Sequence, residues 1–212
     1  MNYSLRPYFI ITLLFLSFGK LTQAQEILGD CSITYAIEKI TDTSKQDVSE
    51  RRTFYSGYKF RSDFIGKNYH QTFIYDDKTK SANIFKEIGD NRYCSTMDST
   101  QWKNYNKKYD KSKTILMDDQ KTILGYRCKK ATIQLKNGDN FIVYYTVDVQ
   151  PSIKENRYEY KDIPGFVLEI SVVSPDNDLK YFAIAKSINL MPLSSSLFNI
   201  SNKGFRKLPP ED

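Results

Sequence analysis

Hydrophobic and polar residues alternate along short stretches of the chain, and a period of two is typical of half-buried β-strands. The clearest stretch runs from Cys31 to Ile40, where Ile33, Tyr35 and Ile37 share one side. The polar stretch Thr41–Glu50 then indicates a loop. Further β-type runs, separated by polar turns, lie at Thr53–Ile65, Gln71–Tyr75, Ser81–Ile88, Asn91–Met97, Phe166–Val173 and Leu179–Ile188. A spacing of about ten residues between strands predicts an antiparallel, mainly β domain.

The strongest local signal is a hairpin centred on Asn137-Gly138, between the β-type runs Thr122–Leu135 and Phe141–Val149. Asn-Gly favours a two-residue turn, which sets Ile133 opposite Ile142. With this register neither face of the hairpin is plainly polar. One face carries Ala131, Ile133, Leu135, Ile142 and Tyr144, and the other carries Cys128, Phe141, Val143, Tyr145 and Val147. We therefore expect either helices that cover the second face or a sheet that curls around a cavity.

The stretch Asp98–Lys113 interrupts the β pattern, because Trp102, Tyr105 and Tyr109 lie among five lysines. Basic residues interleaved with aromatic ones can bind nucleic acid or anionic lipid head groups. The interpretation that we favour is a helix or loop whose aromatic rings pack on the sheet. A second short helix is expected within Met191–Phe205. The fold class is therefore mainly β: a single curved antiparallel sheet, half-barrel-like, with one or two short helices.

Residues 1–24 have the pattern of a cleaved secretory signal peptide. Arg6 precedes an apolar run of ten residues, Phe9–Phe18, and Thr22 and Ala24 are small residues before a cut near Ala24. Residues 25–205 then form one β domain, and residues 206–212 a disordered tail. Cleavage removes two basic residues and no acidic one, and so lowers the formal charge from +6 to +4. We expect a periplasmic or secreted protein with no nucleic-acid partner and no transmembrane segment in the mature chain.

Three cysteines follow the signal pattern, at Cys31, Cys94 and Cys128. An oxidising compartment favours one disulfide and one free thiol, and the sequence cannot assign the pairing. Cys94 and Cys128 are the candidate pair, because both lie in strand-like runs.

Catalytic and metal-binding motifs are not found in the sequence. His70 is the single histidine, and it lies in a loop-like stretch with no motif around it. The adjacent pairs Asp76-Asp77 and Asp118-Asp119 would point to opposite faces of a strand. Asp176-Asn-Asp178 lacks the Gly and the distal Glu of a calcium loop, which favours a turn. The sequence therefore predicts no enzyme, no cofactor and no metal site.

Three segments resemble the GLPGLI family of small secreted envelope proteins of Gram-negative bacteria. They are Ile123–Ala131, Val143–Thr146 and Ile163–Glu169, in matching order over roughly fifty residues. The family positions present here, whose role is unknown, are Gly125, Tyr126, Cys128, Ala131, Pro164, Gly165, Leu168 and Glu169. The chain departs from the family pattern at Asp162, where Gly is usual, and at Phe166, where Leu is usual.

The resemblance implies a sheet similar to the curved half-barrel of periplasmic lipoprotein carriers, and it implies no activity. Our leading hypothesis is a non-catalytic envelope protein that binds a lipid, an acyl chain or another apolar ligand. The alternative is an envelope protein-interaction module, with Pro164-Gly165 and Trp102–Lys113 on the partner surface. An enzyme that uses His70 or a carboxylate is the third hypothesis.

Overall fold

The computed structural model describes residues 26–42, 45, 47–152 and 158–209, so the predicted signal peptide lies outside the described residues. The strands are β1 Glu26–Leu28, β2 Asp30–Ile40, β3 Val48–Ser56, β4 Lys59–Gly66, β5 Tyr69–Asp76, β6 Ser81–Ile88, β7 Asn91–Met97, β8 Lys113–Ile123, β9 Tyr126–Gln134, β10 Asn140–Thr146, β11 Val149–Pro151, β12 Phe166–Val173, β13 Leu179–Asn189 and β14 Arg206–Lys207. The helical elements are α1 Ser99–Tyr105 and the 3₁₀ turns η2 Lys107–Tyr109 and η3 Ser195–Phe198.

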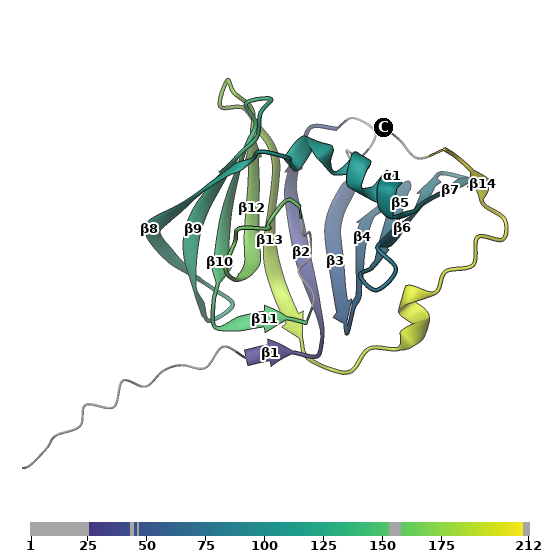
Figure 1. Cartoon of the computed structure of the whole chain (residues 1–212), viewed down its shortest axis with the longest axis horizontal. Helices are drawn as coiled ribbons and strands as arrows, with labels where there is room; N and C mark the ends of the chain where they lie inside the picture. The colour runs from purple at the N-terminus through teal and green to yellow at the C-terminus, as the bar shows by residue number, and fades with distance from the viewer. Residues whose placement is uncertain (1–25, 43–44, 46, 153–157, 210–212) are drawn as a thin grey trace, which may run out of the picture.

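Twelve of these strands form one sheet in the order β14-β7-β6-β5-β4-β3-β2-β13-β12-β10-β9-β8. Neighbours in the sheet are antiparallel, apart from the parallel contact of β14 with β7. Strands β1 and β11 form a separate parallel pair. The large sheet curves strongly and does not close, with β8–β10 on one side and β3–β7 on the other (Figure 1). The predicted fold class is therefore confirmed.

The aromatic stretch between β7 and β8 links the two halves of the curved sheet. Asp98 caps α1 by accepting from the backbone N–H groups of Thr100 and Gln101, and the Gln101 side chain accepts from the Asp98 N–H in return. This capping box starts the helix where the strand pattern ends. Trp102 then packs against β5, and Tyr109 packs 6.2 Å, ring to ring, from a phenylalanine of β10. Both rings are buried, so the packing interpretation of this stretch is confirmed.

Two predicted strands are each two strands in the structure. Thr53–Ile65 divides at Gly57-Tyr58 into β3 and β4, and β3 already begins at Val48, inside the predicted loop Thr41–Glu50. Thr122–Leu135 divides at Leu124-Gly125 into β8 and β9. Alternation continues through a tight turn in both cases, so the hydrophobic pattern alone does not reveal the break.

The predicted register of the central hairpin is wrong by one residue. Ile133 faces Phe141 instead of Ile142. The turn has three residues: the Gly138 N–H donates to the Leu135 carbonyl at 3.1 Å, and Gly138 has φ +89°. A type I turn followed by a left-handed glycine is the common three-residue alternative to the two-residue turn.

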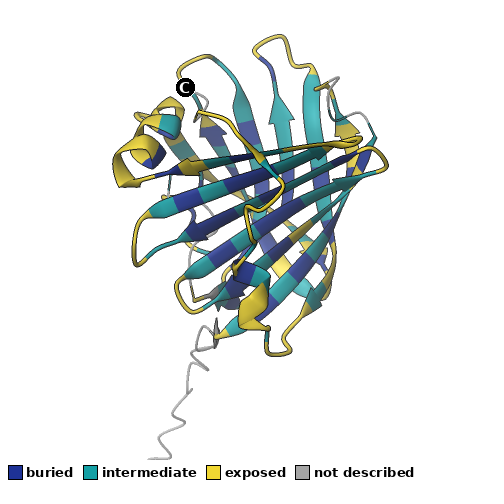
Figure 2. Cartoon of the chain, turned by 90° about the vertical axis from the view of Figure 1, so that its right-hand side faces the viewer, coloured by how far each residue is buried: buried dark blue, intermediate teal, exposed yellow. Residues whose placement is uncertain are grey.

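This correction changes the faces of the hairpin. A shift of one residue moves every side chain of a strand to the other face. The buried residues Ala131, Ile133, Phe141 and Val143 now share one face, and Thr132 and Gln134 lie on the other. The argument from the wrong register allowed either covering helices or a curled sheet, and the structure has the curled sheet. Figure 2 shows the same alternation of buried and less buried positions along the strands.

The segment after β13 crosses the outside of the sheet. In place of the helix expected within Met191–Phe205 there is only the 3₁₀ turn η3, whose Phe198 is buried against β5–β7. The predicted disordered tail is wrong for its first residues, because β14 pairs with β7 and the Leu208 N–H donates to the Cys94 carbonyl at 2.8 Å. Phe205 helps to hold this C-terminal segment on the sheet, because its ring packs edge-on against Phe85, with the two ring centroids 5.2 Å apart.

Candidate ligand-binding cavity

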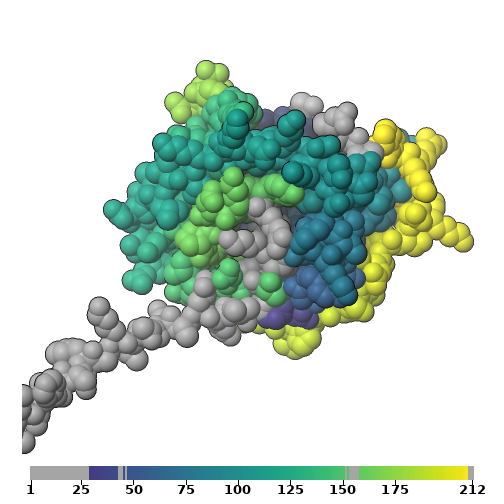
Figure 3. All heavy atoms as spheres, in the orientation of Figure 1, coloured from purple at the N-terminus to yellow at the C-terminus, as the bar shows by residue number. Residues whose placement is uncertain are grey.

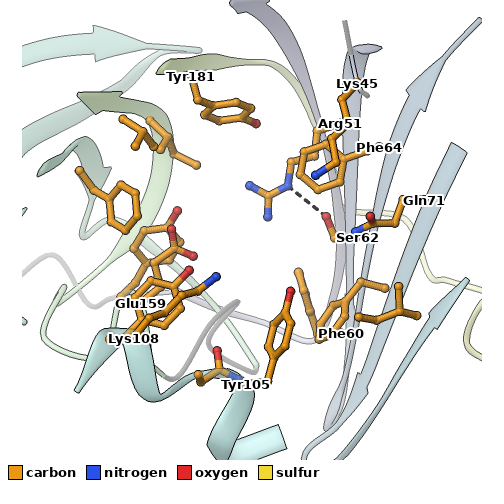
Figure 4. A pocket seen from close by; sticks show the side chains of 18 of the residues that line it. Lys45, Arg51, Phe60, Ser62, Phe64, Gln71, Tyr105, Lys108, Glu159 and Tyr181 are labelled. Atoms are coloured by element: carbon orange, nitrogen blue, oxygen red, sulfur yellow. Dashed lines mark hydrogen bonds between the residues drawn. The ribbon is translucent and has the colours of Figure 1, made fainter. Parts of the chain in front are cut away.

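A cavity of about 370 Å³ lies inside the curl of the sheet. Its lining comes from β3–β6 on one side, from β10, β12 and β13 on the other, and from α1 and η2 between them. Strands that are far apart in the sheet therefore face one another across the cavity (Figure 4). In Figure 3, the teal residues of α1 and η2 lie along the top of the molecule, above the green residues and the blue residues of β3–β5. The volume suits one small amphipathic molecule, because ligand pockets usually measure about 300–1,000 Å³.

Aromatic rings form most of the apolar wall. Trp102 stacks on Tyr105 with ring centroids 5.5 Å apart, and the Phe73 ring centroid lies 5.1 Å from that of Trp102. Phe60 continues the row 6.0 Å from Phe73. The rest of the apolar lining is Ile40, Phe64, Ile84, Tyr109, Phe141, Tyr160, Ile170, Val172 and Tyr181.

Two cations lie at one end of the cavity, beside Phe64 and Tyr181 (Figure 4). The Arg51 Nε–H donates to the Ser62 hydroxyl at 3.0 Å, and the guanidinium lies 5.4 Å from the Phe64 ring centroid. The Lys45 ammonium lies 5.9 Å from the same ring and 3.4 Å from an Asp42 carboxylate oxygen. The contacts with Phe64 hold both positive charges against an apolar wall, where a low dielectric strengthens the attraction of an anion, and Asp42 offsets part of the Lys45 charge.

The other end combines Lys108, Glu159 and Tyr105 (Figure 4). The Lys108 ammonium lies 5.2 Å from the ring centroids of both Tyr105 and Tyr109. Burial raises the pKa of the Tyr109 hydroxyl above its ordinary value, and the nearby Glu159 charge raises that pKa further. Tyr109 is therefore a neutral hydrogen-bonding group at physiological pH.

Asn106 lines the cavity at the junction of α1 and η2. Its side chain is buried, and its Nδ2–H donates to the Trp102 carbonyl at 2.8 Å. Its Oδ1 accepts no hydrogen bond in the described part of the chain.

The family-type residues lie elsewhere and do not line the cavity. Gly125 and Tyr126 form and follow the β8–β9 turn, and Cys128 and Ala131 are buried on β9. Pro164 and Gly165 precede β12, which carries the buried Leu168 and Glu169. A Cβ atom at Gly165 would lie 2.1 Å from the Thr146 carbonyl oxygen, so only glycine permits this close approach. These residues therefore hold β8, β9, β10 and β12 together.

Glu169 has a direct partner in this framework. Its carboxylate accepts a hydrogen bond from the Lys121 ammonium, which also lies 3.8 Å from the Tyr144 ring centroid. The contact joins β8 to β12 across two intervening strands.

The predicted Cys94–Cys128 disulfide is wrong, because Cys31, Cys94 and Cys128 are all free and buried. Cys94 belongs to the cluster under the C-terminal segment, and Cys128 belongs to the main core. Both lie in strands, as predicted, but the two strands are near opposite ends of the sheet order.

His70 lies on β5, close to Thr72 and Asp63, but the arrangement is not that of a catalytic triad. The Thr72 hydroxyl donates to Asp63 at 2.7 Å, and Arg61 pairs with the same carboxylate. His70 reaches Thr72 and Asp63 through the same ring nitrogen, Nε2, at 3.5 and 3.9 Å. A triad histidine instead uses one nitrogen for the nucleophile and the other for the acid.

The acidic candidates form turns or surface contacts. Asp176–Asp178 forms the turn between β12 and β13, where the Asn177 N–H donates to the Ser174 carbonyl. Within the described residues, no group of three His, Cys, Asp or Glu side chains could hold a metal ion.

The polar residues of the cavity were missed by the sequence interpretation. Arg51 and Ser62 lie on separate strands of an ordinary alternating pattern, and Asn106 looks like one more polar residue of a lysine-rich stretch. The one available signal was the aromatic content of Trp102–Lys113, which supplies both packing and part of the cavity wall.

None of the helices in the described residues combines the length and apolar character needed to cross a membrane. Neither a family model nor a curated protein matches the chain. Two crystal forms of PNGF-II are similar to it in structure, with TM-scores of 0.51 and 0.52, 16% and 14% identity, and 85% of this chain covered in each. The chain spans 30% of the length of PNGF-II in one form and 31% in the other. A structure of MucB aligns with a TM-score of 0.47 and 9% identity over 82% of this chain and 57% of MucB.

The likeness to PNGF-II shows a shared fold alone. Fold and site together define a curved-sheet β protein with an internal cavity of mixed aromatic and polar lining.

Proposed function

We propose that this protein is a non-catalytic envelope protein, periplasmic or secreted, that binds an amphipathic ligand inside its curved sheet. The cavity carries the proposal, because its aromatic wall suits an aliphatic chain and Lys45 and Arg51 suit an acidic group at one end. The signal-peptide pattern of residues 1–24 and the resemblance to the GLPGLI family support export to the envelope.

The chain has a built-in reporter for this function. Trp102 is its only tryptophan, and it lines the cavity. A saturable change of tryptophan fluorescence on titration with decanoate is therefore the expected result. Native mass spectrometry of protein purified from the envelope should in addition detect an acidic amphiphile.

A cavity-filling variant and a matched surface variant make the test specific. Val172→Phe adds volume inside the cavity and should weaken decanoate binding by roughly tenfold, because a packed site accommodates extra atoms poorly. Val147→Phe makes the same change at an exposed residue outside the cavity and should leave the affinity unchanged. Equal affinities in both variants, or no fluorescence change in the wild type, would refute the proposed function.

The alternative, a protein-interaction module, is less well supported by the same stretch of chain. Trp102 and Tyr109 are buried, so they are not available to a partner surface. Pro164 is exposed, but Gly165 packs against the Thr146 carbonyl. An acidic amphiphile recovered without a stable protein partner would favour the cavity function.

A further inference from the structure

The Asn106 carboxamide is a buried polar group that is only half satisfied. The residue is 1% exposed, and its side chain lines the cavity. The Asn106 backbone N–H and the side-chain Nδ2–H both donate to the Trp102 carbonyl, at 3.2 and 2.8 Å. The Oδ1 atom has no partner in the described residues.

The orientation of this carboxamide is fixed by its contacts. A rotation of the amide by half a turn would bring Oδ1 against the Trp102 carbonyl oxygen, and two acceptors repel each other. Oδ1 is therefore the acceptor that is left without a donor, on a residue that lines the cavity. The hydroxyl groups of Thr53 and Ser112 also lack a partner in the described residues, but these two groups do not line this cavity and they can rotate. An amide oxygen can be satisfied only by a donor that is brought to it.

A buried acceptor without a donor loses its hydration and gains nothing in return. Native proteins contain few such atoms, and each one calls for an explanation. Leucine has nearly the same shape as asparagine, and at this position it would complete the apolar wall around Trp102 without an unpaired oxygen. The cost of keeping Asn106 is offset if the bound ligand supplies the donor.

We propose that Asn106 selects ligands that carry a hydrogen-bond donor on the aliphatic chain, either a hydroxyl group or an amide N–H. The inference rests on the proposed function and makes its ligand class more specific. The ligand's acidic group lies near Lys45 and Arg51, its chain lies along the aromatic wall, and its donor meets Asn106 Oδ1 at the α1–η2 junction. Asn106 is thus a specificity-determining residue.

Affinities for a matched series of acids test the inference. The series is decanoate, its α-, β- and ω-hydroxylated forms, and N-octanoylglycine, each titrated by isothermal calorimetry into the full chain. At least one donor-bearing acid should bind the wild type about fivefold more tightly than decanoate, as expected for one neutral hydrogen bond. The hydroxylated acids test a hydroxyl group as the donor, and N-octanoylglycine tests an amide N–H.

The variant Asn106→Leu should reduce this preference to less than about twofold while decanoate itself binds at least as tightly as before. Decanoate binding also shows that the variant is folded. Ser112→Ala is the matched control, since it removes another buried, unpartnered polar atom outside the cavity, and it should keep the full preference.

The outcomes separate the inference from the function on which it rests. If decanoate binds the wild type and no donor-bearing acid binds more tightly, the role of Asn106 is refuted while the proposed function stands. A preference that persists in Asn106→Leu refutes the role as well. If none of the acids binds, both proposals fail.

Discussion

Leu124 occupies a backbone conformation that a branched, bulky residue rarely adopts. It has φ +51° in the two-residue turn between β8 and β9, and Gly125 beside it has φ +83°. Non-glycine residues in this left-handed region cost about 1–2 kcal/mol, and asparagine tolerates it best. The Leu124 side chain is exposed, so its replacement removes little packing. We expect Leu124→Asn to raise the free energy of unfolding by about 0.5–1 kcal/mol in urea denaturation.

Leu190→Asn is a suitable control for that measurement, because Leu190 is also exposed but has no positive φ. Its stability should stay within about 0.5 kcal/mol of the wild type. If both variants change stability equally, the backbone strain of Leu124 is not the cause.

The buried thiols give a prediction about pH and reactivity. Burial raises the pKa of Cys31 to about 12 and that of Cys128 to about 11. An unfolded cysteine titrates near pH 8.5, so between that pH and about 11 the unfolded chain loses protons that the folded chain keeps. The stability due to these neutral thiols is therefore complete below about pH 8.5 and falls as the pH rises toward the folded pKa values.

A thiol reagent such as Ellman's reagent checks whether the thiols are buried and whether all three are free. At pH 8 the native protein should react slowly, and the denatured, unreduced protein should show all three thiols. A single reactive thiol after denaturation would instead mean that one disulfide had formed. Unfolding midpoints that stay constant from pH 8 to about 11 would contradict the predicted titration.

The contact between Lys121 and Glu169 ties an edge strand of the sheet to its interior. Glu169 is buried, whereas the Lys121 side chain is about one-third exposed. Removing the partner of a buried charge costs several kcal/mol, and solvent screening reduces that cost here. Lys121→Met should therefore destabilise the protein by about 1–3 kcal/mol in urea denaturation, and the double variant with Glu169→Gln should recover most of the loss.

Lys130 supplies a control on the neighbouring strand. Its ammonium lies 3.9 Å from an exposed Asp119 oxygen, and such pairs contribute about 0–1 kcal/mol. Lys130→Met should accordingly have a small effect. A loss as large as that of Lys121→Met would show that lost packing, rather than an unpaired carboxylate, dominates.

At the scale of strands and turns, the sequence predicts that a strand is present better than it predicts where the strand begins and ends. The strands Ser81–Ile88 and Asn91–Met97 agree with β6 and β7 because alternation and polar turns coincide there. Asn137-Gly138 led to the wrong hairpin register, since the same dipeptide fits a two-residue turn and a three-residue turn with a left-handed glycine. Only contacts between residues distant in sequence distinguish these two turns, such as the 2.7 Å ion pair of Lys180 with Asp139.

At the scale of the whole molecule, the curvature could be predicted but the cavity residues could not. A residue such as Arg51 on β3 reaches the same space as Ile170 on β12 only because the sheet curls. No local pattern marks Arg51 as different from Arg52, whose side chain pairs with Glu50 on the surface. The family-type residues were found because three short segments resemble a known family, and in the structure they lie in turns and close contacts between strands.

The positive end of the cavity gives the last prediction. A charge-assisted hydrogen bond is roughly twice as strong as a neutral one, so Arg51→Gln should weaken decanoate binding by about tenfold at low salt. Binding of methyl decanoate, which has no charge, should be unaffected. Raising the salt concentration should weaken decanoate binding to the wild type more than to the variant, because the Coulomb attraction is screened.

Lys129→Gln removes the same charge from the exposed face of β9 and tests whether net charge alone is responsible. It should bind decanoate as the wild type does. If Arg51→Gln and Lys129→Gln weaken binding equally, the attraction arises from the whole basic surface. If Arg51→Gln binds decanoate as tightly as the wild type, then Arg51 serves to pack Phe64 and Tyr35, with which it makes cation–π contacts, and does not hold the acid.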